Sequence, residues 1–186
     1  MSWLTQLPHK DSDTLMVCHE SNGVRSITKQ DFTEQVTRLL ATLVEFNAEG
    51  VAYQLDNTPA WCVLEAALSE LKKVAIPLPT FFTAQQIAFG LQSSGAGLFV
   101  CDRAYEGEHA RLVALVDVCK HYPLYVYQLT NTQPVPYFAN TQKITFTSGS
   151  TGTPKGVCLS LESQMQVATS LYQSIGLEKP NHLCLL

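Results

Sequence analysis

Apolar positions along the chain follow two alternating patterns, one typical of helices and one typical of strands. From residue 28 to residue 43 they recur every three to four positions, as at Phe32, Val36 and Leu39, which predicts an amphipathic helix. Thr28 and Asp31 have the residue types and the spacing of a capping box, so this helix is expected to begin at Thr28.

Four further segments carry helical signals. Proline stands at the first helical position of a segment that begins near Thr58, and Thr83 with Gln86 forms a second capping box. The helix that follows Thr83 is expected to end at Gly95. Residues 106–121 are also expected to be helical, because apolar side chains recur at helical spacing: Leu112, Leu115, Val116 and Cys119. Ser160 is expected to cap a last helix.

Short apolar runs separate these helices and are expected to be strands. They cover residues 51–55, 74–78, 98–101, 124–129, 143–147 and 156–159. Strands that alternate with helices are typical of an α/β fold, here a layered, mostly parallel sheet flanked by helices. All 186 residues are assigned to one domain, with an inter-element loop at about residues 130–142, where prolines and asparagines break the pattern.

Composition narrows the possible functions. The formal net charge is −4 and there is no basic run, so nothing favours nucleic-acid binding. No apolar run approaches the roughly 20 residues of a membrane span, and no signal peptide is evident, so a cytoplasmic location is expected. The six cysteines are widely spaced, which argues against a metal site or a disulfide framework. Only 15% of residues are charged, which predicts that part of the surface contacts other protein, including self-association.

Residues 148–155 have the composition of a polyphosphate-binding loop. Their glycines let backbone N–H groups converge on an anion, their hydroxyl groups add donors, and a lysine adds positive charge. The segment does not match the common P-loop pattern, because Pro154 stands in place of the second glycine and Gly156 in place of the Mg²⁺-binding hydroxyl. The apolar residues that follow also indicate a strand, whereas a P-loop leads into a helix.

Residues 147–156, with the sequence TSGSTGTPKG, resemble the signature loop of the adenylate-forming superfamily. That superfamily includes acyl-CoA synthetases, firefly luciferase and the adenylation domains of peptide synthetases. Residues 56–61, 71–78 and 91–102 also resemble family segments, so the resemblance covers most of residues 23–160. It implies the N-terminal part of the large, AMP-binding domain of such a ligase.

The resemblance implies a two-step reaction in which ATP activates a small-molecule carboxylate as an acyl-adenylate, and a thiol of CoA or of a carrier protein's phosphopantetheine then accepts the acyl group. It assigns phosphate binding to hydroxyl donors, loop-shaping glycines and one cation: Thr147, Ser148, Ser150, Thr151 and Thr153; Gly149, Gly152 and Gly156; and Lys155. Mg²⁺ is expected in the full-length enzyme. The final residues faintly resemble long-chain acyl-CoA ligases, which points to fatty acid metabolism.

Family motifs for adenine, ribose and Mg²⁺ are not found in the sequence, so the catalytic residues are expected beyond Leu186. The chain is therefore interpreted as an N-terminal fragment that is inactive alone. The alternative is a non-catalytic α/β module that keeps the fold and serves binding or assembly.

Overall fold

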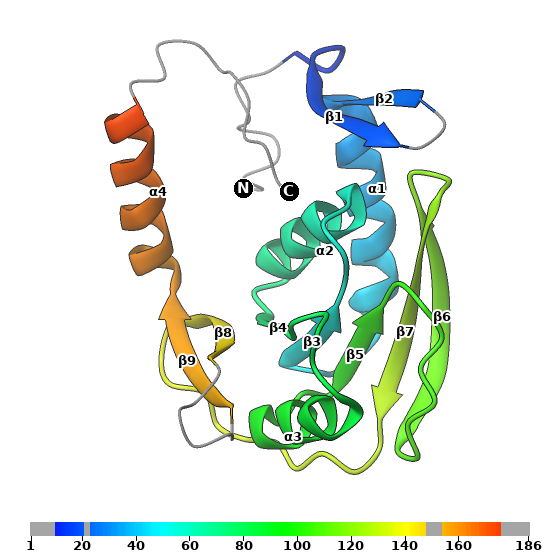
Figure 1. Ribbon diagram of the computed structural model, residues 1–186, viewed down its shortest axis with the longest axis vertical. Helices are drawn as coiled ribbons and strands as arrows, with labels where there is room; N and C mark the ends of the chain where they lie inside the picture. Colours follow the sequence, from blue (N-terminus) through cyan, green and yellow to red (C-terminus); the bar gives the residue numbers. More distant parts are fainter. Residues whose placement is uncertain (1–9, 21–22, 148–153, 176–186) are drawn as a thin grey trace.

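The computed structural model describes residues 10–20, 23–147 and 154–175. Figure 1 shows a sheet with helices on both of its faces. In chain order the elements are β1 (Thr14–Glu20), β2 (Gly23–Thr28), α1 (Lys29–Leu43), β3 (Gly50–Gln54), α2 (Pro59–Glu70), β4 (Val74–Pro77), α3 (Ala84–Ser94), β5 (Leu98–Cys101), β6 (Ala110–Val118), β7 (Tyr122–Leu129), β8 (Thr141–Thr147), β9 (Lys155–Ser160) and α4 (Leu161–Ile175).

The main sheet has seven strands in the order β6-β7-β5-β3-β4-β8-β9, and β1 and β2 form a separate antiparallel pair. Strand β3 pairs in parallel with β4 and with β5, and β4 pairs in parallel with β8. The remaining pairs, β5–β7, β6–β7 and β8–β9, are antiparallel. The predicted α/β fold is confirmed, with a sheet that is parallel at its centre and antiparallel towards both edges.

Both predicted capping boxes are present. The Thr28 hydroxyl accepts a hydrogen bond from the Asp31 backbone N–H at 3.1 Å, and the Asp31 carboxylate accepts one from the Thr28 backbone N–H at 3.1 Å. The same reciprocal pair at Thr83 and Gln86 begins α3. Gly95 ends α3 with a φ of 63°, a left-handed conformation that glycine adopts at little cost.

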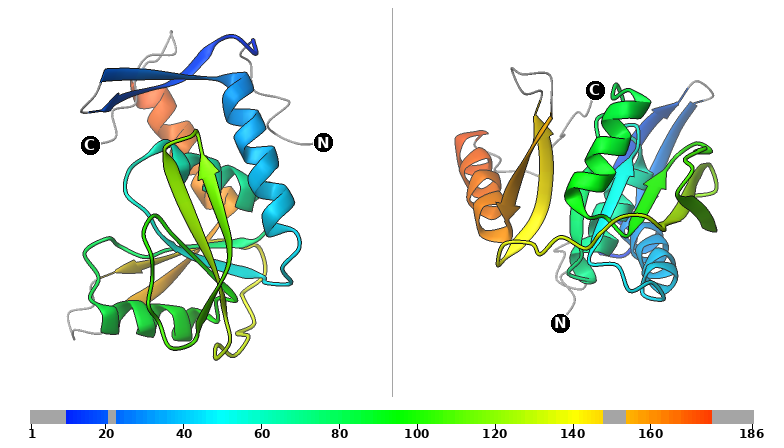
Figure 2. Two further views of the ribbon diagram at one scale, coloured as in Figure 1. Left: turned by 90° about the vertical axis from the view of Figure 1, so that its right-hand side faces the viewer. Right: turned by 90° about the horizontal axis from the view of Figure 1, so that it is seen from below.

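The central strands are buried on both faces, and alternate side chains enter two different cores. Val51 and Tyr53 of β3 face α1 and α2, while Ala52 between them faces α3. Figure 2 shows α1 and α2 on one side of the sheet and α3 on the other. Burial on both faces explains why these strands appear in the sequence as short continuous apolar runs.

The helix predicted over residues 106–121 is wrong, because this segment forms strand β6. Near its end, Val116 and Val118 are buried and alternate with the exposed Leu115, which is the two-residue period of a strand. A tight turn then joins β6 to β7 through Cys119 and Lys120, both at positive φ. Such turns usually contain asparagine or glycine, so the sequence offers no hairpin signal here.

Strand β8 begins at Thr141, and residues 131–140 form the irregular connection from β7. Among the helices in the described part of the chain, none is both long enough and apolar enough to span a membrane.

Candidate functional site

The candidate site is formed by the β8–β9 hairpin. The two strands pair antiparallel with Thr147 opposite Lys155, and the Thr147 hydroxyl donates a hydrogen bond to the Lys155 carbonyl oxygen at 3.4 Å. Strand β9 starts at Lys155, where a P-loop would instead continue into a helix. The predicted placement of the signature segment between two adjacent strands is therefore confirmed.

The described ends of the signature segment have distinct surroundings. Thr147 and Lys155 are exposed, so their hydroxyl and ammonium groups are open to a ligand, whereas Pro154 is buried. The other predicted site residues lie outside the described residues: Ser148, Gly149, Ser150, Thr151, Gly152 and Thr153.

Gly156 lies at a crowded position in the hairpin. It lies in β9 opposite Phe146, and a Cβ atom at this position would be 3.0 Å from Ile144 Cγ2. Its backbone is not in the left-handed region, so space is the constraint at this position.

The hairpin brings Thr147 to the side of the sheet where the parallel strands have their carboxyl ends, and ligands of α/β proteins usually bind on that side. Because β8 runs parallel to β4 and β4 to β3, Thr147 lies on the same side of the sheet as the carboxyl ends of these strands. Ligands of open α/β sheets bind outside the carboxyl ends of parallel strands. The position of the hairpin agrees with a role for the signature segment in ligand binding.

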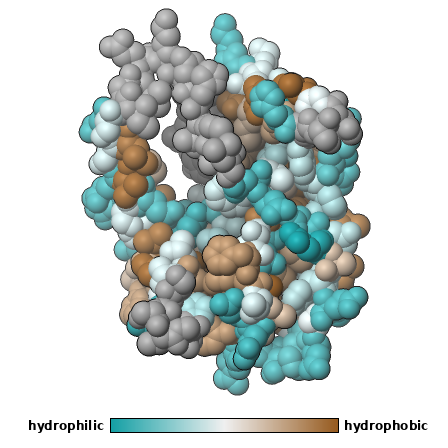
Figure 3. Space-filling model, in the orientation of Figure 1, coloured by the Kyte–Doolittle hydropathy of each residue, from teal (hydrophilic) through white to brown (hydrophobic). Residues whose placement is uncertain are grey.

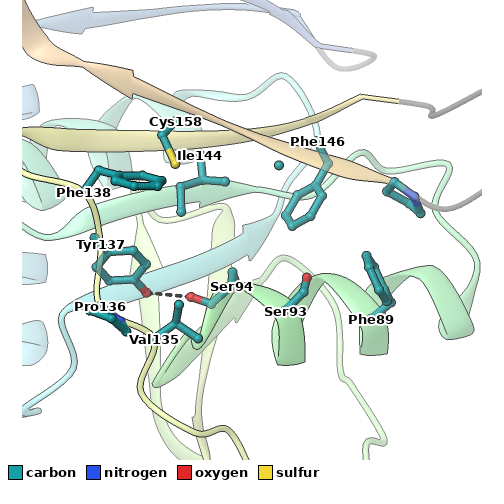
Figure 4. A pocket seen from close by; sticks show the side chains of 12 residues that line it. Phe89, Ser93, Ser94, Val135, Pro136, Tyr137, Phe138, Ile144, Phe146 and Cys158 are labelled. Carbon is teal, nitrogen blue, oxygen red and sulfur yellow. Dashed lines mark hydrogen bonds between the residues drawn. The ribbon is translucent and has the colours of Figure 1, made fainter.

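A cavity of about 240 Å³ lies between the hairpin and α3. Figure 4 shows Ile144 and Phe146 on the hairpin side and Ser93 on the α3 side, with Tyr137 and Phe138 nearby. The Tyr137 hydroxyl donates to the Ser94 carbonyl oxygen at 2.8 Å, and burial raises the pKa of Tyr137 to about 12. Among the described residues, no charged side chain lines this cavity, so they do not make it suited to hold phosphate.

An ion pair on the other face of the hairpin was not predicted from the sequence. Lys143 of β8 donates to the Glu65 carboxylate of α2 at 2.7 Å, and the same carboxylate oxygen accepts from the Tyr53 hydroxyl. Burial, followed by the negative charge of Glu65, raises the pKa of Tyr53 well above its ordinary value, so this phenol remains a proton donor. The only sequence signal was a lysine at the start of an otherwise uncharged strand.

A second polar cluster lies further along the same edge. Arg103 contacts Asp102 at 3.0 Å and Asp56 at 3.6 Å. The hydrogen bond to Asp102 raises the pKa of Arg103 above its ordinary value. Strands β5 and β8 are three steps apart in the sheet, about 14 Å at the usual strand spacing, so this cluster belongs to a different part of the edge.

A metal centre is not evident in the part of the chain that the structure describes, and the buried Cys101 is not an activated thiol. No group of three or more His, Cys, Asp or Glu side chains there could hold a metal ion. Burial, and then the charge of Asp102, raises the pKa of Cys101 to about 12, so this thiol stays protonated at neutral pH.

Comparison with solved structures supports the same fold. The chain is similar to o-succinylbenzoate CoA synthetase (MenE) from Bacillus subtilis in complex with AMP, with 21% identity and a TM-score of 0.68 over 94% of this chain and 46% of that one. It is also similar to apo MatB from Rhodopseudomonas palustris, with 16% identity and a TM-score of 0.65 over 92% and 36%. The chain thus spans less than half the length of these structures.

A third similar structure is the inhibitor-bound N-terminal domain of FACL13 from Mycobacterium tuberculosis, with 20% identity and a TM-score of 0.58 over 80% of this chain and 41% of that one. The comparison with curated proteins gives no match. A family model described as AMP-binding enzyme matches residues 6–186. The match covers nearly the whole chain, including the hairpin, and the chain therefore belongs to the AMP-binding enzyme family.

Proposed function

We propose that this chain is the N-terminal part of the adenylation domain of an ATP-dependent ligase that activates a small-molecule carboxylate. One observation carries the proposal. The β8–β9 hairpin holds the ends of the ten-residue signature segment together, on the side of the mixed sheet where the carboxyl ends of its parallel strands lie. The family match and the fold of the similar synthetases support the same function.

The reaction forms one bond and breaks another at the α-phosphorus of ATP. A carboxylate oxygen bonds to this phosphorus, and pyrophosphate leaves with the electrons of the broken P–O bond. The signature segment holds the β- and γ-phosphates through its hydroxyl groups, its backbone N–H groups and the Lys155 ammonium group. Charge that accumulates on the departing pyrophosphate is stabilised there without further reorganisation.

The acyl-adenylate is then passed to a thiol of CoA or of a carrier protein, so the overall activity is that of an acid–thiol ligase. Mg²⁺ would neutralise phosphate charge in the reaction. The described residues supply no cluster of metal ligands, and the phosphate oxygens of ATP would provide part of the ion's coordination. Adenine and ribose contacts lie outside this chain, and the 186 residues alone are expected not to complete the reaction.

Calorimetric titration of the purified chain tests phosphate binding by the signature segment. ATP and pyrophosphate are expected to bind more tightly than AMP, because the segment binds the β- and γ-phosphates. Replacing Lys155 by Met removes a charge-assisted contact and should weaken ATP binding roughly ten- to a hundredfold. Lys120→Met, in the turn at the opposite edge of the sheet, is the matched control and should bind ATP as the unaltered chain does.

Equal affinity of Lys155→Met and the unaltered chain would remove Lys155 from the site.

Carboxylate-dependent exchange between ATP and pyrophosphate tests the activity itself, and none is expected from these 186 residues. Exchange by a longer protein that contains this chain supports the ligase. A longer protein that binds ATP but shows no exchange with any carboxylate would favour the non-catalytic binding module.

A further inference from the structure

The hairpin that carries the signature segment meets the rest of the sheet at a seam between β4 and β8. The two strands share one paired position, Ala75 with Lys143, whereas β3 and β4 share four. Figure 2 shows β8, β9 and α4 set to one side of the other strands. Strands β4 and β8 lie side by side along the seam, but ladder pairing between them is sparse, so side-chain contacts contribute to the angle between the hairpin and the sheet.

Side chains hold this seam on the face covered by α2. Lys143 sits at the one paired position and reaches Glu65 of α2 at 2.7 Å, and both side chains are more than three-quarters buried. One residue earlier, Gln142 donates to the Ser69 hydroxyl at 3.2 Å. On this face the hairpin is thus fixed to α2 through neighbouring residues at the start of β8.

The Glu65 carboxylate is itself held in place by a hydrogen bond from the sheet. It accepts a hydrogen bond from the hydroxyl group of Tyr53 in β3. That hydroxyl group in turn accepts a hydrogen bond from the Trp61 indole N–H at 3.4 Å. Tyr53 is 2% exposed and belongs to one of the buried central strands of the sheet. The chain of contacts therefore runs from the rigid centre of the sheet through Glu65 to Lys143.

The opposite face of the hairpin is packed against the core in part. Ile144 is buried in the cluster that includes residues of α3, and Phe146 contacts Phe82 with ring centroids 6.5 Å apart. Beside them, the cavity of about 240 Å³ separates part of the hairpin from α3 and the connection near Phe138. This cavity leaves the hairpin room to tilt when the ion pair on the other face is lost.

The distance from the seam to the site makes such a tilt important. Four residues separate Lys143 from Thr147, about 13 Å along a strand, so a tilt of about 10° would move the base of the signature segment by about 2 Å. Displacements of about 1 Å in positioning groups can already cost a large factor in rate. Contacts that fix the angle of the hairpin at the seam therefore bear directly on the position of Thr147.

We propose that Glu65 and Lys143 are positioning residues for the phosphate-binding segment: their ion pair fixes the angle of the β8–β9 hairpin against α2 and the sheet. The link to phosphate binding rests on the proposed function, while the mechanical role does not. Neither residue contacts the nucleotide in this proposal. They act through β8, which connects the seam directly to Thr147.

The experiment combines hydrogen exchange with ATP titration on the whole chain. In Lys143→Met, backbone amides of β8 and β9 are expected to exchange roughly tenfold faster while those of β3 and β5 keep their rates, and ATP binding should weaken roughly tenfold. Lys143→Arg keeps the positive charge and should restore both. Glu65→Gln should behave as Lys143→Met, and the double variant should be no worse than either single one.

Lys29→Met is the matched control, because it breaks another ion pair, with Asp11 at 3.3 Å, at the start of α1. It should leave exchange in the hairpin and ATP affinity unchanged. Unchanged hairpin exchange in Lys143→Met, or an equal acceleration in β3 and β5, overturns the proposal. A loosened hairpin with undiminished ATP affinity overturns the positioning role. If the unaltered chain binds no ATP, the proposed function fails, and the exchange rates still decide whether the ion pair holds the hairpin.

Discussion

The centre of the sheet and the β8–β9–α4 unit differ in how deeply their residues are buried. Strand β3 has neighbours on both sides and helices on both faces, and Val51 and Ala52 are fully buried. Strand β9 is the last strand of the sheet, and residues 155–158 are exposed. The centre therefore contributes most of the buried apolar surface, while the outer strand of the hairpin is largely open to solvent.

Helix α4 extends the same contrast. It carries an apolar surface that the described part of the chain does not cover, since several large apolar side chains are more than half exposed: Leu161, Met165, Val167, Leu171 and Tyr172. Apolar atoms over α4 are visible in Figure 3. The comparison teaches that the buried core and the signature segment are separated in this chain, with the core in the centre and the signature segment at one side of the sheet. Each prediction below applies matched changes to the two regions.

Truncating leucine in the two regions should give the largest difference. Leu64 of α2 is fully buried and Leu171 of α4 is 56% exposed. Leu64→Ala leaves a cavity in the core and should lower the free energy of unfolding by about 3 kcal/mol. Leu171→Ala should change it by less than about 0.5 kcal/mol. Urea denaturation followed by circular dichroism measures both, and similar losses would contradict the separation.

Elements with strong local signals could be predicted from the sequence. The capping boxes at Thr28 and Thr83 placed two helices correctly, because those signals involve residues only three positions apart. The buried central strands were found because both of their faces are apolar. The signature segment was placed correctly between two strands for the same reason, since an apolar run follows Lys155.

The failures have a common physical cause, which is stabilisation by distant residues. The turn at Cys119 is held by Gln35, which accepts from its N–H at 3.2 Å, and by Arg25, which donates to its carbonyl oxygen at 2.9 Å. No residue near 119 in the sequence indicates these contacts. The helical spacing of the apolar residues therefore predicted a helix where the structure has a strand. The pair Glu65–Lys143 is separated by 78 residues and was missed for the same reason.

Glycine replacement compares backbone strain in the centre with crowding in the hairpin. Gly95 has a φ of 63°, and an added Cβ would be 2.7 Å from the Val135 backbone nitrogen, which cannot easily move. Gly95→Ala should cost about 2 kcal/mol of stability. Gly156→Ala meets only the Ile144 side chain at 3.0 Å and should cost about 1 kcal/mol. Equal thermal shifts for the two variants would show that the hairpin is as tightly constrained as the centre.

Helix caps give a third and smaller contrast. The Thr83 hydroxyl caps α3, and the Ser160 hydroxyl accepts from the Ser163 N–H at 3.1 Å at the start of α4. Thr83→Ala should lower global stability by about 1 kcal/mol. Ser160→Ala should speed amide exchange within α4 and leave the global urea midpoint unchanged, because little packing couples this helix to the core. A global loss in Ser160→Ala would show that α4 unfolds together with the centre.

The smallest expected effect is a loss of stability at acidic pH. It should occur at the cap of α1, which contains a carboxyl group, and not at the cap of α4, which does not. The hydrogen bonds from the Thr28 side chain and backbone lower the pKa of Asp31 below its ordinary value of 3.8. A carboxyl group with a depressed pKa in the folded state contributes stability above its unfolded pKa, and that contribution is lost as pH falls through the folded value. Ser163 occupies the matching position in α4 and does not titrate.

Lowering the pH from about 5 to about 2 should therefore weaken the start of α1 while leaving the cap of α4 unaffected. Asp31→Asn should flatten the dependence of the urea midpoint on pH in this range, since the variant has already lost the titrating contact. Glu34→Gln, one turn further along the same helix, removes a carboxyl group without altering the cap and is the control. If Asp31→Asn and the unaltered chain lose stability in parallel as pH falls, the Thr28–Asp31 pair is not a source of acid sensitivity, and the contrast between the two caps fails.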